Sequence, residues 1–172
     1  MSFSLYEAVI PSMIQLLNAG QGWIEKAKAS DIPEEKLAQA SLIDDMAPFA
    51  QQVRWMVAHS VGAIEGVRAG IMEPDLGEPA QELEQMRLNL GAAENTLRAI
   101  SKGEIDSFIG GTTVFKLASR NIELPFKSED FLLSFSQPNF YFHTTTAYGI
   151  LRKQGLDIGK LDYLGQLRMV QG

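Results

Sequence analysis

The chain has 172 residues, of which 45% are hydrophobic and 21% are charged, and its formal net charge is −6. This length suits a single domain, 1–172, that buries a core without disulfides. The absence of cysteine excludes thiolate catalysis and cysteine metal sites. Lysine and arginine are scattered, so no basic stripe is present for nucleic acid or an anionic membrane. No apolar stretch reaches the roughly 18 residues of a membrane span, and the start lacks a signal peptide, so we expect a cytoplasmic protein.

The first predicted helix starts behind a capping box, in which the Ser4 hydroxyl and the Glu7 carboxylate each satisfy a free backbone donor. Apolar residues at helical spacing extend this helix to about Lys28, and we expect a kink at Pro11. The polar stretch 29–42 predicts a turn or a short additional helix.

Two further helices follow in the middle of the chain. The second is predicted to begin at Asp44 or Asp45, either of which can cap it, and to end at Gly70. The third is predicted to start around Glu78 and to run to Ile100. Its apolar residues recur in alternating steps of three and four, which is the strongest helical periodicity in the chain.

Residues 101–127 differ in composition from the helices. Glycines punctuate this stretch, and the segments 112–115 and 122–124 have strand-like composition. We therefore expect a crossover that contains a short β-hairpin.

An aromatic-rich fourth helix starts either at Ser128, with a kink at Pro138, or at Pro138 itself, and it ends near Gln154. The tail, 156–172, is expected to fold back over the helices. Four amphipathic helices with one long crossover predict an all-α fold, a four-helix bundle with the hairpin between helices three and four.

Two segments carry a family resemblance: 138–152, PNFYFHTTTAYGILR, and 159–165, GKLDYLG. They resemble an uncharacterised, domain-of-unknown-function branch of the DinB/YfiT-like superfamily. Ser4-Leu5-Tyr6 and Asp45-Met46-Ala47-Pro48 fit the same branch, so the resemblance covers essentially the whole chain. It implies a DinB-like four-helix bundle with a short connection between helices two and three, and it also implies frequent homodimers.

The resemblance also implies a candidate metal site. Members of the wider superfamily often hold a divalent metal on three histidines, and some transfer thiols or hydrolyse small amides. His59 and His143 match the first two ligand positions, but Ala147 stands at the third and cannot bind a metal. Two imidazoles and one carboxylate could still hold zinc, nickel or iron. Glu94, on the inward side of the third helix, is the candidate carboxylate.

Helical geometry predicts different orientations for the two histidine side chains. At 100° per residue, His143 shares a face with Phe140 and should point into the core, whereas His59 lies roughly 120° from the centre of its apolar stripe. The two can meet only if the second helix is rotated. His143 is then either a buried neutral imidazole bonded to Asn139, or a polar anchor in an apolar ligand pocket with Asn139, Phe140 and Tyr148.

Small residues recur at intervals of four on the second helix, at Ala58, Gly62 and Gly66. Such a row allows another helix to approach closely. It predicts either a helix-to-helix dimer interface or a close contact with the tail or the crossover.

Two functional hypotheses remain, and whether the protein is an enzyme stays open. The first is a homodimer that binds a small molecule or serves as a scaffold, with an incomplete metal site and no expected cofactor. The second is a divalent-metal-dependent transferase or hydrolase that uses His59, His143 and a carboxylate or water. Two ligand nitrogens that share a metal at about 2.1 Å cannot lie much more than about 4 Å apart, so the separation of the imidazoles bears on this choice.

Overall fold

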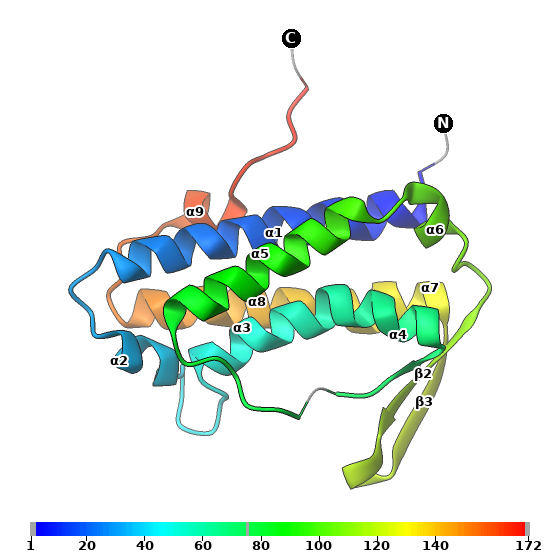
Figure 1. The fold of residues 1–172 in the computed structure, drawn as a ribbon, viewed down its shortest axis with the longest axis horizontal. Helices are drawn as coiled ribbons and strands as arrows, with labels where there is room; N and C mark the ends of the chain where they lie inside the picture. The colour runs from blue at the N-terminus through cyan, green and yellow to red at the C-terminus, as the bar shows by residue number, and fades with distance from the viewer. Residues whose placement is uncertain (1–2, 75, 171–172) are drawn as a thin grey trace.

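The computed structural model describes residues 3–74 and 76–170, and in this part of the chain four long helical segments lie side by side (Figure 1). The first and third segments pack on each other, the second packs on the fourth, and the second also contacts the third. The buried apolar side chains of all four form one core. The segments are α1 (Leu5–Lys28), α3–η1–α4 (Phe49–Val57, Ala58–Gly62 and Ala63–Ala69), α5 (Leu83–Ala99) and α7–η3–α8 (Ser128–Asp130, Phe131–Ser136 and Gln137–Lys153).

The start of α1 confirms the predicted capping box. The Ser4 hydroxyl accepts a hydrogen bond from the Glu7 amide, and the Glu7 carboxylate accepts one of 2.9 Å from the Ser4 amide. The helix continues through Pro11 and ends at Lys28, as the apolar spacing predicted.

The second and third helical segments begin later than predicted. The segment expected at Asp44 or Asp45 begins at Phe49, whose amide donates a 2.8 Å hydrogen bond to the Ala40 carbonyl. The segment expected at Glu78 begins at Leu83. The Leu83 amide is capped by the carboxylate of Glu34, which lies 49 residues earlier in the chain. In both cases the first amide of the helix bonds a group outside that helix.

The capping carboxylate belongs to a short helix, α2 (Glu34–Gln39), which confirms the alternative of an additional helix in 29–42. A carboxylate at a helix start also interacts favourably with the helix dipole. The α2 helix therefore fixes where α5 begins.

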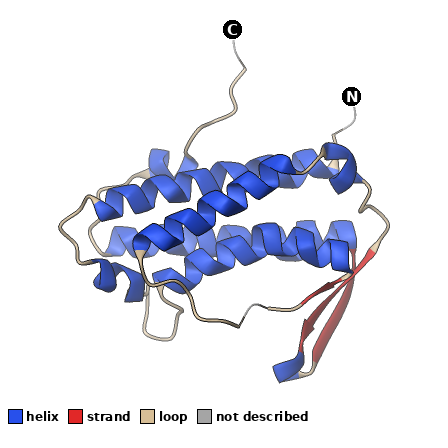
Figure 2. Ribbon diagram, viewed as in Figure 1, coloured by secondary structure: helices blue, strands red, loops and turns tan. Residues whose placement is uncertain are grey.

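A small sheet projects beyond one end of the helices (Figure 2). The predicted hairpin is present and longer than expected: β2 (Thr112–Leu117) pairs antiparallel with β3 (Ile122–Lys127). A strand that the sequence did not indicate, β1 (Ile71–Met72), pairs parallel with β2, with Ile71 opposite Val114. Two residues are too short for a recognisable alternating pattern.

The crossover from α5 to the sheet contains α6 (Lys102–Asp106), and a turn of 3-10 helix, η2 (Ala118–Arg120), joins β2 to β3. The fourth helical segment begins at Ser128 and continues through Pro138, so the first of the two predicted starts applies. No helix in residues 3–74 and 76–170 is both long and apolar enough to span a membrane.

The tail folds back onto α1, as predicted, through α9 (Lys160–Leu164). The Trp23 indole donates a 2.8 Å hydrogen bond to the Asp162 carbonyl. The Tyr163 ring stacks on Trp23 with centroids 5.7 Å apart, and its hydroxyl lies 3.0 Å from that of Thr145. Beyond α9, residues 166–169 line a pocket with α1, and the end of the chain projects away from the helices (Figure 1).

Candidate functional site

His59 in η1 and His143 in α8 lie side by side. Their ring centroids are 5.5 Å apart and the ring planes differ by 21°. The Trp55 ring lies 4.8 Å from that of His143, and the Phe135 ring lies 5.9 Å from that of His59. His143 is 8% exposed, so it points inward as predicted, whereas His59 is half-buried. The structure therefore places the two histidines together among aromatic side chains.

His59 lies on the face of the second helical segment that contains Gln52 and Met56, as predicted, but this face is buried: Gln52 is 1% exposed and Met56 is 0% exposed. Residues Ala58–Gly62 form a π-helical turn, η1, which includes His59. A π-turn contains one more residue than an α-turn, so it shifts the helical register by roughly the 100° of one residue. Gln52 and Trp55 of the regular helix α3 already contact His143, and His59 follows them at helical spacing on the same face, toward α8.

A second π-helical turn, η3 (Phe131–Ser136), lies in the opposite helical segment and contacts the first. The hydroxyl of Ser136, which is fully buried, donates a 2.9 Å hydrogen bond to the main-chain carbonyl of His59. Within η1, the Ser60 hydroxyl lies 2.8 Å from the Met56 carbonyl and 3.1 Å from the Val57 carbonyl. Serine hydroxyls thus bond carbonyls in and beside the irregular turn.

The amide of Gln52 determines which nitrogen of His143 carries a proton. Its Nε2 donates a 3.0 Å hydrogen bond to the Ala47 carbonyl, so its Oε1 faces His143 Nδ1 at 2.8 Å. An amide oxygen only accepts, so Nδ1 must be the protonated nitrogen of His143. In the neutral ring, Nε2 then carries a lone pair. The expected bond between His143 and Asn139 is replaced by this one.

Both imidazoles are held neutral near pH 7. Burial lowers the pKa of His59 to about 4. Burial, followed by the nearby charge of His59, lowers the pKa of His143 to about 4. The Nδ1 atom of His59 is buried and has no hydrogen-bond partner among the described residues. The site therefore offers two uncharged rings, one of which has an unsatisfied buried nitrogen.

The other residues predicted to line a pocket with His143 have separate surroundings. The Asn139 amide donates a 2.7 Å hydrogen bond to the Phe135 carbonyl, and Phe140 is fully buried in the core. Tyr148 packs edge-on against Trp23, at 5.8 Å, where the tail covers α1. The expected pocket of Asn139, Phe140, Tyr148 and His143 is therefore not the arrangement that the structure displays.

Glu94 also has a different role from the one predicted. Its carboxylate accepts a hydrogen bond of 2.7 Å from Gln21, two from Arg98 at 2.6 and 2.8 Å, and one from Asn18. Burial opposes ionisation, but these hydrogen bonds outweigh it and lower the pKa of Glu94. Glu94 thus joins α5 to α1 as an ionised, nearly buried group.

The residues present do not match the three-histidine metal site that the superfamily resemblance implies. A catalytic zinc normally takes three protein ligands. Here two imidazoles converge, while position 147 is a buried alanine. Within 3–74 and 76–170, no three histidine, aspartate or glutamate side chains cluster closely enough to hold a metal, so Glu94 does not complete a site with the histidines. The proximity of the two imidazoles does not by itself distinguish a metal-dependent enzyme from a binding protein. The lack of a third clustered ligand in the described residues argues against the enzyme.

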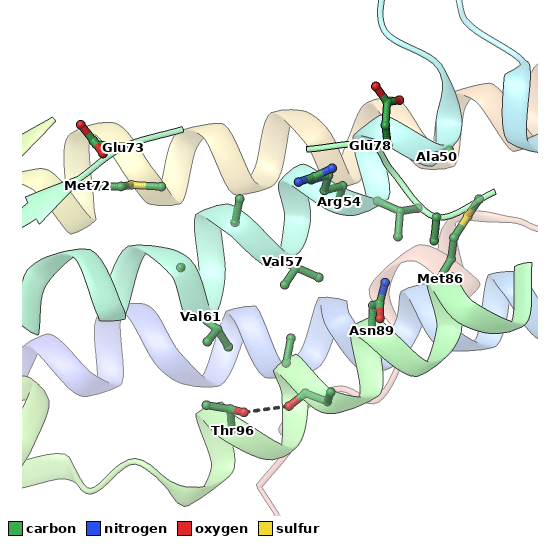
Figure 3. A pocket seen from close by; sticks show the side chains of 16 residues that line it. Ala50, Arg54, Val57, Val61, Met72, Glu73, Glu78, Met86, Asn89 and Thr96 are labelled. Atoms are coloured by element: carbon green, nitrogen blue, oxygen red, sulfur yellow. Dashed lines mark hydrogen bonds between the residues drawn. The ribbon is translucent and has the colours of Figure 1, made fainter. Parts of the chain in front are cut away.

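A pocket of about 560 Å³ lies between α3–η1–α4 and α5 (Figure 3). Val57 and Val61 point across it toward α5, and Met86 and Asn89 project from α5 on the opposite wall (Figure 3). Thr96 lines the exposed rim of the pocket. This volume falls within the usual range of small-molecule sites.

Small residues on facing helices are a sequence signal that could have indicated this pocket. Ala58 and Gly62 line it from η1, and Ala93 lines it from α5. Gly66, which continues the row, packs against Met72 so closely that an added Cβ would lie 2.8 Å from the Met72 Cβ. At Gly66 the contact is therefore within the chain, but with β1 and not with the tail or the crossover as predicted, while the other two residues border the pocket.

A solved structure and a family model match this chain over most of its length. A solved structure described as a DinB family member protein from Shewanella denitrificans superposes with a TM-score of 0.79, covering 98% of this chain and 96% of that chain at 21% identity. This likeness confirms the DinB-like fold that the motifs around His143 suggested. No curated protein matches the chain. A family model for a domain of unknown function, DUF1993, matches residues 5–164, and the chain therefore belongs to the DUF1993 family.

Proposed function

We propose that the protein is a DinB-like four-helix bundle that binds a small, mainly apolar molecule in the pocket between α3–η1–α4 and α5. The observation that carries this proposal is the 560 Å³ pocket bounded by both helical segments. The proposal includes a cytoplasmic homodimer, which rests on the composition and on the family resemblance.

The walls of the pocket indicate the kind of ligand. Valine and methionine side chains line its centre, including Val57, Val61 and Met86. Charged groups lie toward the edges, with Arg54 and Glu78 near each other at one end (Figure 3). Apolar walls with a few placed polar groups are typical of small-molecule sites. The ligand we expect has an apolar body and one polar group.

Methionine methyl groups offer a direct test. Met72 and Met86 line the pocket, whereas Met13 and Met56 are fully buried elsewhere in the core. In protein labelled with ¹³C at the methionine methyls, titration with 2-naphthol, a neutral aromatic alcohol, should shift the Met72 and Met86 signals. Absence of a shift at both would contradict the proposed site for this class of ligand.

A pair of variants controls this titration. Ala92 is an exposed residue that lines the pocket, so Ala92→Trp should occupy its mouth and abolish the response. Ala99 is an exposed alanine of the same helix outside the pocket lining, so Ala99→Trp should bind like the wild type. Equal binding by both variants would place the ligand elsewhere.

A second candidate function has one observation in its favour. A divalent-metal-dependent transferase or hydrolase would use the pair His59 and His143, whose rings lie 5.5 Å apart. It needs a third donor that the clustered side chains do not supply. Elemental analysis of untagged protein tests it, because near one metal per chain, lost in both His59→Ala and His143→Ala, would favour this function over the first.

A further inference from the structure

A second pocket, of about 470 Å³, lies between α1 and the tail that follows α9. Two contacts with α1 hold the tail just before it reaches the pocket. The Gln15 amide donates a 2.7 Å hydrogen bond to the Leu164 carbonyl, and Gly165 adopts a φ of +60° directly against Ala19. A Cβ at Gly165 would lie 3.1 Å from the Ala19 Cβ, so this turn favours glycine. These contacts of Leu164 and Gly165 with α1 therefore position the tail residues that follow, which form one side of the pocket.

Two arginines line this second pocket from different elements, Arg98 from α5 and Arg168 from the tail. Arg98 bonds Glu94 through Nε at 2.8 Å and Nη2 at 2.6 Å, which leaves its remaining N–H donors for another partner. Arg168 contacts the Ser12 hydroxyl at 3.3 Å, and no carboxylate pairs with it in residues 3–74 and 76–170. The residues that line this pocket thus include two cationic side chains and no acidic one, on a chain whose formal net charge is −6.

Apolar side chains line the same pocket. Pro11 and Ile14 contribute from α1, and Leu167 and Met169 contribute from the tail. Leu167 is 48% exposed and Met169 is 77% exposed, so their apolar surface remains in contact with water. A ligand that covered them while pairing with the arginines would bury that surface.

We propose that this pocket binds a small amphipathic carboxylate. The carboxylate lies between Arg98 and Arg168, because a guanidinium presents parallel N–H donors that match two carboxylate oxygens. The hydrocarbon part lies along Ile14, Leu167 and Met169. This site is separate from the pocket of the proposed function, and neither proposal depends on the other.

The same methyl-labelled protein tests this site, because Met169 lines it while Met72 and Met86 line the other pocket. Sodium hexanoate should shift the Met169 signal and leave those of Met72 and Met86 in place. The neutral analogue 1-hexanol should bind about tenfold more weakly, since it lacks the charge. Equal affinities for hexanoate and 1-hexanol, or a Met169 response to inorganic phosphate as strong as to hexanoate, would overturn the proposal.

Matched variants separate the arginine contact from general charge. Arg168→Gln removes an exposed cation of the tail and should weaken hexanoate binding about tenfold. Arg120→Gln removes an exposed cation from the turn between β2 and β3 and should leave binding unchanged. Wild-type affinity in Arg168→Gln, or equal weakening in both variants, would overturn the assignment.

Discussion

The hydroxyl of Ser136 donates a hydrogen bond to the main-chain carbonyl of His59 and so joins two π-helical turns, η3 and η1. This contact bonds a backbone group of the irregular turn that contains His59. π-turns inside α-helices are uncommon and occur frequently at functional sites. The histidine pair and one wall of the larger pocket both depend on η1, because Ala58 and Gly62 of the same turn border that pocket.

Replacing Ser136 with alanine should therefore destabilise the protein. The His59 carbonyl would lose its hydrogen bond from a fully buried donor, and we expect the free energy of unfolding to fall by about 1–2 kcal/mol. Ser134 is an exposed serine of the same turn, so Ser134→Ala should change the stability by no more than about 0.5 kcal/mol. Urea denaturation of both variants checks this, and equal losses would show that the contact across the turns contributes little.

The two histidines should differ in what they contribute to stability. His143→Ala leaves the buried Gln52 oxygen without its 2.8 Å partner, so we expect a loss of about 2–3 kcal/mol. His59→Ala removes a half-buried ring whose Nδ1 has no hydrogen bond in the described part of the chain, and should cost about 1 kcal/mol. Thermal melts measure the difference. Equal or reversed losses would refute this ranking.

Stability should decrease as the pH falls below 6.5. The pKa of each histidine is lowered to about 4 by burial, whereas an unfolded histidine titrates near 6.5. Between these values the unfolded state binds more protons than the folded state, so the free energy of unfolding rises with pH and levels off above about 6.5.

We expect the free energy of unfolding to fall by about 2–4 kcal/mol from pH 7 to pH 5, because each pKa unit corresponds to about 1.4 kcal/mol and both histidines contribute. Urea denaturation at several pH values measures this slope. The double variant His59→Gln/His143→Gln should show little dependence over the same interval. A slope as steep as that of the wild type would assign the effect to other groups.

Local sequence signals predicted much of the fold correctly. The capping box at Ser4 and Glu7 and the apolar spacing of α1 depend on neighbours within a few residues, and the structure confirms both. The starts at Phe49 and Leu83 depend on the Ala40 carbonyl and the Glu34 carboxylate instead. Contacts of that kind form only in the folded chain, so spacing along the sequence does not reveal them.

At the candidate site, some features were predicted from the sequence and others were not. The inward orientation of His143 followed from regular periodicity in α8. The burial of His59 was missed because the apolar spacing centred the inward face on Val53 and Val57, whereas the polar Gln52, on the side of His59, is itself buried against His143. The predicted role of Glu94 failed for a related reason, since its facing partners are Asn18 and Gln21 of α1 rather than the histidines.

Glu94 should act as a structural link between α1 and α5. Its side chain is 10% exposed and bonds Arg98, whereas Glu65 is 56% exposed and bonds Arg68 on its own helix. Glu94→Gln should reduce the free energy of unfolding by about 1–3 kcal/mol, because charged hydrogen bonds in a nearly buried site are lost. Glu65→Gln should cost no more than about 0.5 kcal/mol. Comparable losses in urea denaturation would contradict the role of burial.

Two glycine-to-alanine changes should have opposite effects. Gly22 lies on an exposed face of α1 with open space around it, so Gly22→Ala should stabilise the helix by about 0.5–1 kcal/mol through its higher helix propensity. At Gly66 the new methyl would lie 2.8 Å from the Met72 Cβ, so Gly66→Ala should displace β1 and cost about 1–3 kcal/mol. Differential scanning calorimetry of the two variants measures both changes. Stabilisation by Gly66→Ala would mean that β1 does not pack on α4 in solution, and the wall that Met72 gives the larger pocket would then be absent as well.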